Sequence, residues 1–388
     1  MKEYKLLKTC LRYVVPFAFD VDGSAFSELC ASVEGQKEAD QEGKVHTVWK
    51  KNYVKAHGPE SDLYGYVKSE FLFEDKNSSI DKEHLGYSWN HWMNRKNKED
   101  VNYVLRLEYD FGKKQFCEIK IIRAGLYLFR TGLGLFWYEI ERPMELSESS
   151  QLVHFQNVFR ELNRAKRFYR NGKPFALGTW IAELLSFLSV HFLAERWPQT
   201  DTVEGRKLSA KQQMVPDKAL LFSYVCMEDD GETKEHEREQ LAFYLANGYK
   251  ESFVYSGEND DKMRRPFGTS LWYATQEGAA YLAWPTKENR RTFTGTIFSK
   301  FKVDYFTLYI KTLYQSFSLL IYAERIQKEI SADYTTYAVK TVQDSGSGEE
   351  IKKATDLITE INLFLTKSMA TSVSHLHHQN DFYGYLKG

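Results

Sequence analysis

The residue best placed to bind an anion is Arg130, which lies in a short turn between two long apolar segments. It is the only charged residue between Ala124 and Tyr138, and Thr131 and Gly132 follow it directly. Glycine permits positive φ and lets another group approach the backbone closely. A guanidinium in such a turn can hold a phosphate or a carboxylate through paired hydrogen bonds. The alternative is an ordinary hairpin turn whose arginine faces water.

Four further residues are weaker candidates for the same ligand pocket, because each is a polar or aromatic group that interrupts an apolar pattern. They are Trp137, Asn157, Arg160 and Trp272. Aromatic residues also stand beside basic ones at Phe129-Arg130 and at Arg265-Pro266-Phe267. Proteins hold adenine-containing ligands by stacking a ring on the base and placing an arginine nearby. Core packing is the alternative for any one of these residues.

A second chemistry is indicated by two carboxylates and a lysine, Asp110, Glu118 and Lys120. A predicted hairpin carries all three, and Glu118 and Lys120 share one face of a strand. Metal-dependent nucleases and phosphodiesterases use such a set, with carboxylates on Mg²⁺ and the lysine beside the attacking water. Alternating charge on a solvent-facing strand gives the same pattern. The enzyme is therefore kept as the alternative function.

Three histidines near the C-terminus, His375, His377 and His378, are the remaining candidates for metal binding. On a helix His375 and His378 share a face, but a polar helix end explains them as well. The sequence contains no Walker loop, no G-x-S-x-G and no G-x-G-x-x-G motif. We therefore predict no catalytic residue, no metal and no cofactor.

The composition is that of a globular chain without a strong electrostatic field. Of the 388 residues, 43% are hydrophobic and 27% are charged, and the formal net charge is −1. This length predicts two or three domains with ample core. The lack of net positive charge argues against direct binding to nucleic acid. The four cysteines form no C-x-x-C pair, and a reducing cytoplasm is the expected compartment.

Strands dominate residues 1–146, which predict the antiparallel-sheet part of an α+β domain. Aromatic and β-branched residues fill both halves of a predicted hairpin at 118–142. Residues 6–19 predict an opening strand, in which Pro16 indicates an edge or a bulge. Residues 101–111 alternate in polarity and predict another strand.

Residues 147–300 predict a mixed α/β part that completes the domain. Apolar residues at helical spacing predict a helix from 147 onward. Residues 175–197 predict a buried helix rather than a membrane span, because charged residues interrupt the apolar run. Strands are predicted at 219–226 and as a pair near 267–274 and 278–284, with a helix between them that stops at Gly248.

Residues 301–388 predict long C-terminal helices in a hairpin or stalk. The first is expected from about Asp304 to Ile330. The second carries a narrow apolar seam at spacings of three and four, which fits one helix partner from the same chain or from a neighbouring subunit. The seam consists of Ile351, Ala354, Ile358, Ile361, Leu365 and Met369.

The order of several short segments carries a family resemblance. They are 11–17 (LRYVVPF), 126–136 (LYLFRTGLGLF), 272–278 (WYATQEG), 313–320 (LYQSFSLL), 373–374 (VS) and 379–383 (QNDFY). Together they resemble the cytoplasmic region of bacterial CorA-like proteins, especially those associated with type III CRISPR systems. The similarity covers most of the chain.

The resemblance implies the ligand-sensing part of an antiviral membrane effector, not itself an enzyme. In that family an α+β domain at the cytoplasmic face of the inner membrane leads into long helices and two spans with a Gly-Met-Asn signature. The CRISPR-associated members respond to a nucleotide second messenger in which AMP is joined to S-adenosylmethionine. This chain ends at Gly388 without a span or that signature. It is thus expected to be either the cytoplasmic part of a longer protein or a spanless relative, and to form a homo-oligomer.

Overall fold

A twelve-stranded sheet forms the centre of the molecule. The computed structural model of the protein describes residues 3–19, 25–39, 45–53, 61–80, 84–91, 104–110, 115–143, 146–162, 168–170, 173–185, 218–229, 231, 234–249, 262–340, 347–369 and 372–387. The strands of the sheet are β1 (Leu6–Ala18), β4 (Trp49–Lys51), β5 (Gly86–His91), β6 (Val104–Asp110), β7 (Gln115–Phe129), β8 (Leu133–Ile140), β9 (Phe168–Arg170), β10 (Lys173–Phe175), β11 (Leu220–Met227), β12 (Met263–Phe267), β13 (Ser270–Thr275) and β14 (Gly278–Ala283).

The strands follow the order β10-β9-β6-β7-β8-β1-β11-β14-β13-β12, and β5 pairs with both β7 and β4. All of these pairs are antiparallel except β11 with β14. Two more strands, β2 (Lys37–Ala39) and β3 (Val45–Thr47), pair apart from the sheet. The sheet joins strands from 1–146 and from 147–300, so both parts share one framework. The predicted α+β class is confirmed.

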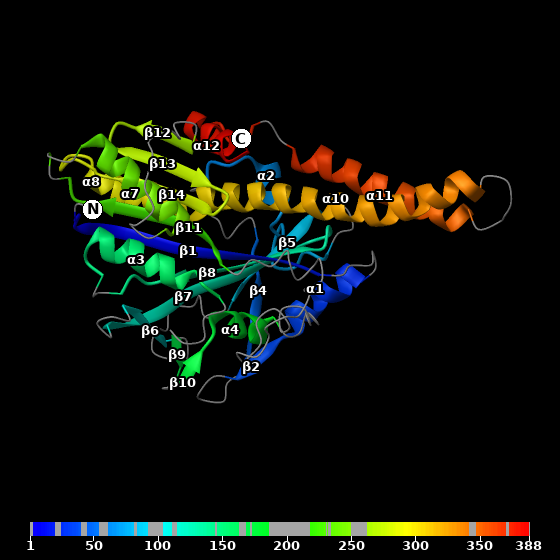
Figure 1. Cartoon of the computed structure of the whole chain (residues 1–388), viewed down its shortest axis with the longest axis horizontal. Helices are drawn as coiled ribbons and strands as arrows, with labels where there is room; N and C mark the ends of the chain where they lie inside the picture. Colours follow the sequence, from blue (N-terminus) through cyan, green and yellow to red (C-terminus); the bar gives the residue numbers. More distant parts are fainter. Residues whose placement is uncertain are drawn as a thin grey trace.

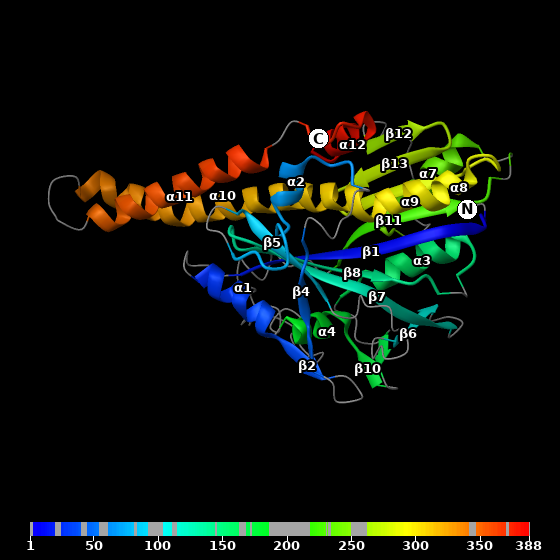
Figure 2. The same cartoon turned by 180° about the vertical axis from the view of Figure 1, so that it is seen from behind.

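Helices lie on both faces of the sheet (Figures 1 and 2). They are α1 (Ala25–Gly35), α2 (Gly65–Ser69), α3 (Ser149–Phe159), α4 (Leu177–Leu184), α7 (Glu235–Asn247), α8 (Arg290–Thr292), α9 (Phe298–Lys300), α10 (Phe306–Lys340), α11 (Ser347–Ser368) and α12 (His377–Lys387), with two π-helical turns, η5 (Phe293–Ile297) and η6 (Phe301–Tyr305). Among the described residues no helix has the length and apolarity that a membrane crossing needs. Of the helix predicted at 175–197, only the segment that contains α4 falls within the described residues.

The predicted hairpin at 118–142 is confirmed and lies in the middle of the sheet. β7 and β8 pair as far as Leu128 and Gly134, and residues 130–132 make the turn. Gly132 has a φ of 83°, and a Cβ there would lie 2.7 Å from the carbonyl oxygen of Phe19. The turn therefore requires glycine, as its sequence indicates.

β1 lies between β8 and β11, and Pro16 occupies the end of β1 that extends beyond β11. The pairing with β11 stops at Val14, whereas the pairing with β8 continues to Ala18. Proline lacks the N–H that a second neighbour would need. In the described sheet Pro16 thus has the edge environment that its type predicts.

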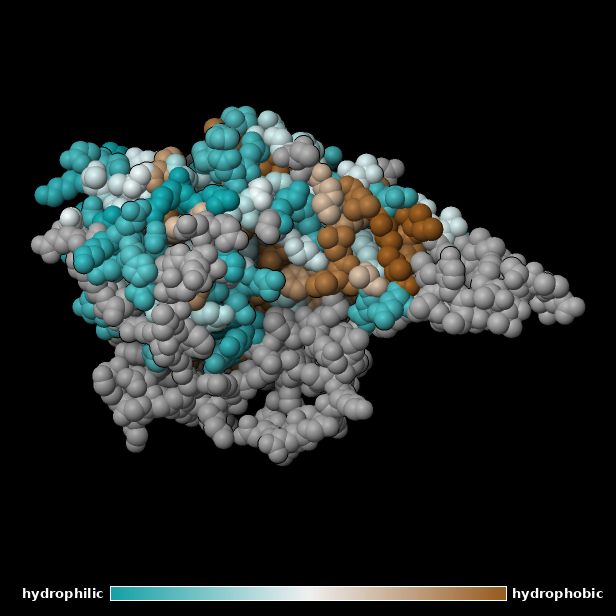
Figure 3. Space-filling view, turned by 45° about the horizontal axis from the view of Figure 1, so that its top comes forward, coloured by the Kyte–Doolittle hydropathy of each residue, from teal (hydrophilic) through white to brown (hydrophobic). Residues whose placement is uncertain are grey.

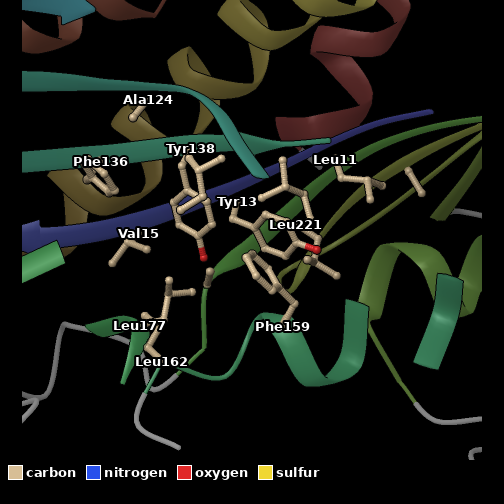
Figure 4. Close-up of a cluster of buried hydrophobic side chains, with 14 of the residues drawn as sticks. Leu11, Tyr13, Val15, Ala124, Phe136, Tyr138, Phe159, Leu162, Leu177 and Leu221 are labelled. Atoms are coloured by element: carbon tan, nitrogen blue, oxygen red, sulfur yellow. The ribbon is translucent and has the colours of Figure 1, made fainter. Parts of the chain in front are cut away.

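Alternate side chains of the strands fill two cores, one on each face, because successive residues of a strand point in opposite directions. On one face Tyr13 and Tyr138 stack with ring centroids 5.2 Å apart and meet Phe159 of α3 (Figure 4). Helices α1, α4 and α7 contribute to the same core. On the other face Val14 and Phe222 pack with α2, α10 and α12.

The helix that covers this second face is much longer than predicted. From Arg290 to Lys340 one helical segment follows another without a break, through α8, η5, α9, η6 and α10. α10 crosses the sheet and then projects beyond it beside α11 (Figure 1). Gln315 of α10 contacts Ser368 of α11, and Arg325, further along α10, contacts Glu360, so the two helices are antiparallel. The predicted long helical region is confirmed, but its first helical segment begins at Arg290, well before the expected start at about Asp304.

The seam predicted for α11 is rotated by one residue. Leu357 and Phe364 are each 1% exposed and pack into the core that contains α10. Ile358 and Leu365, which were predicted to face the partner helix, are 54% and 42% exposed. Both sets repeat every seven residues, so spacing alone does not distinguish them. Of the other seam positions, Ile361 and Met369 pack partly against the core, and the side chains of Ile351 and Ala354 lie outside the described residues.

A buried ion-pair cluster ties the sheet to the start of the long helix. Glu139 accepts hydrogen bonds from Nε and Nη2 of Arg12 at 3.0 and 2.9 Å, and Nζ of Lys302 lies 2.7 Å from its second oxygen. Burial alone raises the pKa of Glu139, but the charges of Arg12, Lys302 and Arg123 outweigh burial and hold that pKa at about 2. The cluster is therefore charged at neutral pH.

Candidate functional site

The turn that carries Arg130 packs against other parts of the chain. Nε of Arg130 donates a hydrogen bond to the carbonyl oxygen of His84 at 2.7 Å, and its guanidinium lies 4.8 Å from the ring centroid of Phe26. Thr131 is buried, and its hydroxyl lies 3.1 Å from that of Ser318 on α10. These contacts within the chain account for the packing of the turn without a bound ligand.

Asn157 and Arg160 tie the end of α3 to the end of α7. Arg160 is 2% exposed and donates to the carbonyl oxygen of Asn247 and to the carboxylate of Glu277. Asn157 donates to the carbonyl oxygen of Gly248, the residue that ends α7. Both side chains satisfy backbone carbonyls at a helix end, so their contacts are those of structural residues.

The two tryptophans lie on the face that α10 covers, but in different surroundings. Trp137 lies under the guanidinium of Arg12 at 4.9 Å and meets the ring of Phe306 at 5.1 Å. Trp272 lies on β13 and lines a pocket. The seven predicted site residues therefore do not share one pocket in the described structure. Binding of a ligand to the Arg130 turn stays a prediction.

The pocket that Trp272 lines has a volume of about 900 Å³ and lies between β12 and α12. Residues 264–267 of β12 form one wall, and one side of α12, from His377 to Tyr385, forms the other. These two elements lie next to each other at the edge of the sheet (Figure 1). Tyr385 joins α12 to β13, because its hydroxyl accepts a hydrogen bond from the N–H of Ala274 at 2.7 Å.

Two arginines of β12 line the pocket. The guanidinium of Arg264 lies 5.2 Å above the ring of Tyr385 and donates to the carbonyl oxygen of Met263. Arg265 forms ion pairs with Glu235 and Glu239 of α7 at 2.7 and 2.8 Å, so part of its charge is neutralised. Arg264 lies over a ring of the opposite wall, which makes it a candidate to meet an anionic ligand.

The histidines and the carboxylate of α12 add groups that can donate and accept. His378 is half-buried, with its ring 5.9 Å from that of Phe267. Burial lowers the pKa of His378, against the opposing charges of Asp62 and Asp381. His377 and Asp381 lie 3.3 Å apart, one helical turn from each other. Among the described residues, no three or more His, Cys, Asp or Glu side chains are grouped so that they could bind a metal ion.

Aromatic rings form the inner wall of the pocket. Trp272 and Phe382 lie 4.1 Å apart, and each lies 5.1 Å from Tyr305 of η6. Trp272 is 2% exposed, and its indole N–H has no hydrogen-bond partner within the described structure. A buried donor of this kind is a group that a bound ligand can satisfy.

The register of β6 and β7 separates the residues of the predicted nuclease site. Asp110 stands opposite Gln115, whereas Glu118 stands opposite Arg106. Positions 106 and 110 are four residue steps apart along the strand, which is about 13 Å. Glu118 and Lys120 are exposed, as on an ordinary solvent-facing strand. The backbone register therefore sets the two carboxylate positions apart along the strands, and the enzyme alternative stays a prediction.

Comparison of the chain with protein-family models, with curated proteins and with solved structures found no match in any of the three.

Sequence reasoning missed Arg264, His378 and Tyr385 as pocket residues. The sequence carries part of the signal, because basic and aromatic residues are adjacent at Arg265-Pro266-Phe267. What no local pattern shows is that β12 meets α12, which follows it by more than a hundred residues.

Proposed function

We propose that this chain is a ligand-sensing domain that binds a nucleotide in the pocket between β12 and α12. The observation that carries the proposal is the meeting of an arginine with several aromatic rings in one open pocket of about 900 Å³. A phosphate pairs well with a guanidinium, and a base stacks well on an aromatic ring. Pockets of small-molecule sites have volumes of roughly 300–1,000 Å³, so a dinucleotide-sized ligand fits.

The family resemblance supports a particular ligand, the conjugate of AMP with S-adenosylmethionine. This molecule combines two adenine bases and a phosphate with a cationic sulfonium and an amino group. Arg264 suits the phosphate, and Tyr385 and Phe267 suit the bases. Asp381 suits the cationic part. On the same resemblance, we propose that binding regulates a membrane part outside this chain, in the antiviral defence of a type III CRISPR system.

The test is calorimetric titration of the chain with the conjugate, with AMP, with ATP and with S-adenosylmethionine. We expect the conjugate to bind more tightly than AMP or S-adenosylmethionine alone, because it reaches both the cationic and the anionic groups of the pocket. Absence of binding to all four compounds by a folded chain would reject the proposal. Tightest binding of ATP would keep the pocket but replace the ligand.

Replacing Arg264 by alanine is expected to weaken binding about tenfold. Arg264 lies at the exposed rim, so its contact with a phosphate is worth about 1.5 kcal/mol, the low end for a charged hydrogen bond. Arg130→Ala is the matched arginine variant and should leave the affinity unchanged. If Arg130→Ala weakens binding and Arg264→Ala does not, the ligand binds at the β7–β8 turn.

The homo-oligomer implied by the resemblance has a candidate surface on the helical hairpin. Apolar residues gather over α10 and α11 in Figure 3. Leu319 and Ile326 of α10 are 46% and 39% exposed, and Ile358 and Leu365 of α11 are 54% and 42% exposed. We call these four residues the apolar stripe. Exposed aliphatic residues in such a row mark a contact surface.

The helical geometry brings the four residues to the same side of the hairpin. Residues seven apart share one face of a helix. Ile326 follows Arg325, which contacts α11, and Leu365 follows Phe364, which contacts α10. Because the two helices are antiparallel, moving one residue toward the C-terminus on each helix turns the side chain toward the same side of the pair.

A second copy of the chain is the partner that we propose for the apolar stripe. Among the described residues beside the stripe, Ser316, Ala323, Thr355 and Asn362 are exposed and uncharged. Identical surfaces without charge do not repel each other when they meet. A helix-to-helix contact between copies buries the stripe on both sides.

We expect the double variant Ile358→Asp/Leu365→Asp to lose self-association and to keep its fold, because both side chains are exposed in the single chain. The measurement is light scattering over a wide range of concentration, with circular dichroism to check the fold. Asn362→Asp adds a charge beside the stripe and is the control for charge alone. A parent chain that stays monomeric at every concentration would remove the oligomer.

A further inference from the structure

Helix α12 contacts both the pocket and the base of the helical hairpin. His378, Phe382 and Tyr385 line the pocket. Tyr383, on the same short helix, is 1% exposed and packs in the core beneath α10. A change in the position of α12 therefore reaches the hairpin directly.

Gln315 of α10 joins α12 to both helices of the hairpin. Its side-chain amide donates hydrogen bonds to the hydroxyl of Tyr383 at 2.7 Å and to the carbonyl oxygen of Ser368. Ser368 is the last residue of α11. One buried amide thus holds three helices at the point where α11 leaves α10.

A second buried bond joins α12 to the π-helical turn η6. Nε2 of Gln379 donates to the carboxylate of Asp304 at 3.0 Å, and the backbone N–H of Asp62 donates to the same oxygen at 3.1 Å. The side chains of Gln379 and Asp304 are 0% exposed. π-Helical turns are strained relative to α-helix and recur at functional sites, and η6 continues directly into α10.

The inner wall of the pocket is itself part of this connection. Tyr305 of η6 touches Trp272 and Phe382, each with ring centroids 5.1 Å away. A ligand that contacts the wall therefore meets rings that pack on the start of the long helix. Packed cores of this kind have few alternative arrangements and transmit small displacements.

We propose that α12 is the coupling element that transmits occupancy of the pocket to the packing of α11 on α10. The inference rests on the proposed function, since it needs a ligand that contacts α12. Such a ligand shifts the hairpin only as far as it favours one position of α12 over another. Coupling is reciprocal, so a change in the Gln315 bonds must also change the affinity for the ligand.

The test compares amide hydrogen exchange in α11 with and without the AMP–S-adenosylmethionine conjugate. We expect the ligand to change the exchange of residues 347–368 in the parent chain. Tyr383→Phe keeps the ring and removes the bond to Gln315, and it should reduce the ligand's effect about fivefold. By reciprocity, the loss of coupling should also change the affinity for the ligand. Gln315→Met removes both bonds of the amide, to Tyr383 and to Ser368, and should reduce the ligand's effect at least as much.

Tyr322→Phe is the matched control, because Tyr322 contacts α11 through Glu360 and has no part in the bonds of α12 described above. It should respond to the ligand as the parent chain does. If the ligand binds but Tyr383→Phe and Gln315→Met respond like the parent chain, coupling through α12 is rejected and the pocket remains. If no ligand binds, the proposed function and this inference fall together.

Discussion

The free energy of unfolding is expected to fall steeply below pH 4.5. His91 is 1% exposed, and burial lowers its pKa from 6.5 to about 3, so only the unfolded chain takes up its proton between these values. Glu139 behaves in the same sense, because its pKa falls from 4.5 to about 2 in the folded chain. Where both groups act, the free energy of unfolding falls by about 2.7 kcal/mol per pH unit.

The fall is masked between pH 4.5 and 7 by a group of opposite sign. Burial raises the pKa of Glu70 from 4.5 to about 7, against the attraction of Lys311. The folded chain therefore holds the extra proton in this range, which offsets the loss from His91 as the pH falls. Below pH 4.5 Glu70 is protonated in both the folded and the unfolded chain. It then no longer offsets the loss of stability from His91 and Glu139.

Urea denaturation at a series of pH values from 3 to 8 measures this profile. His91→Gln should halve the slope below pH 4.5, to about 1.4 kcal/mol per pH unit, because one of the two protonations is removed. His375→Gln changes an exposed histidine and is the control. An unchanged slope in His91→Gln would show that His91 is not buried in its neutral form.

Replacing Lys311 by methionine is expected to cost about 3–5 kcal/mol at pH 8. Lys311 is 0% exposed and forms an ion pair with Glu70, whose side chain is 7% exposed. Methionine fills the space of the lysine stem but leaves a carboxylate uncompensated in the core. At pH 5 the cost should be smaller, because the raised pKa of Glu70 lets the carboxyl become neutral.

The double variant Glu70→Leu/Lys311→Met separates the pair from its surroundings. Removing both charges together leaves no uncompensated group, and such replacements are often neutral or stabilising. We therefore expect the double variant to lie near the parent chain in urea denaturation. A loss as large as that of Lys311→Met alone would mean that packing, not charge, explains the single variant.

Much of the fold follows from local sequence patterns. The hairpin at 118–142 is visible because both strands are rich in aromatic and β-branched residues around a turn with glycine. The end of α7 is visible because Gly248 adopts the left-handed conformation, with a φ of 57°, that few other residues tolerate. These signals need no knowledge of the rest of the chain.

Other features depend on contacts that a pattern does not contain. The π-helical turns between Phe293 and Tyr305 change the spacing of side chains, so a search for a repeat of 3.6 finds the helix only from about 304. In α11 the buried residue of each adjacent pair is set by the rings of α10 that surround Phe364. Neither effect can be read from one segment alone.

The candidate site also combines features that local sequence patterns indicate with features that depend on distant contacts. Basic residues beside aromatic ones indicate a ligand surface, and Trp272 and Phe267 do line the pocket. The prediction gave most weight to Arg130, because a lone arginine in a glycine-bearing turn between apolar strands can hold a phosphate or a carboxylate. In the structure that charge meets the carbonyl oxygen of His84 and the ring of Phe26, and both partners come from distant segments.

The most direct test of the nucleotide pocket is photo-crosslinking with an azidoadenine form of the AMP–S-adenosylmethionine conjugate, followed by mass spectrometry of the digested chain. We predict adducts in peptides that contain residues 264–272 and 377–385, and their loss when excess unmodified conjugate is added. Adducts confined to residues 126–137, around Arg130, would contradict the pocket between β12 and α12.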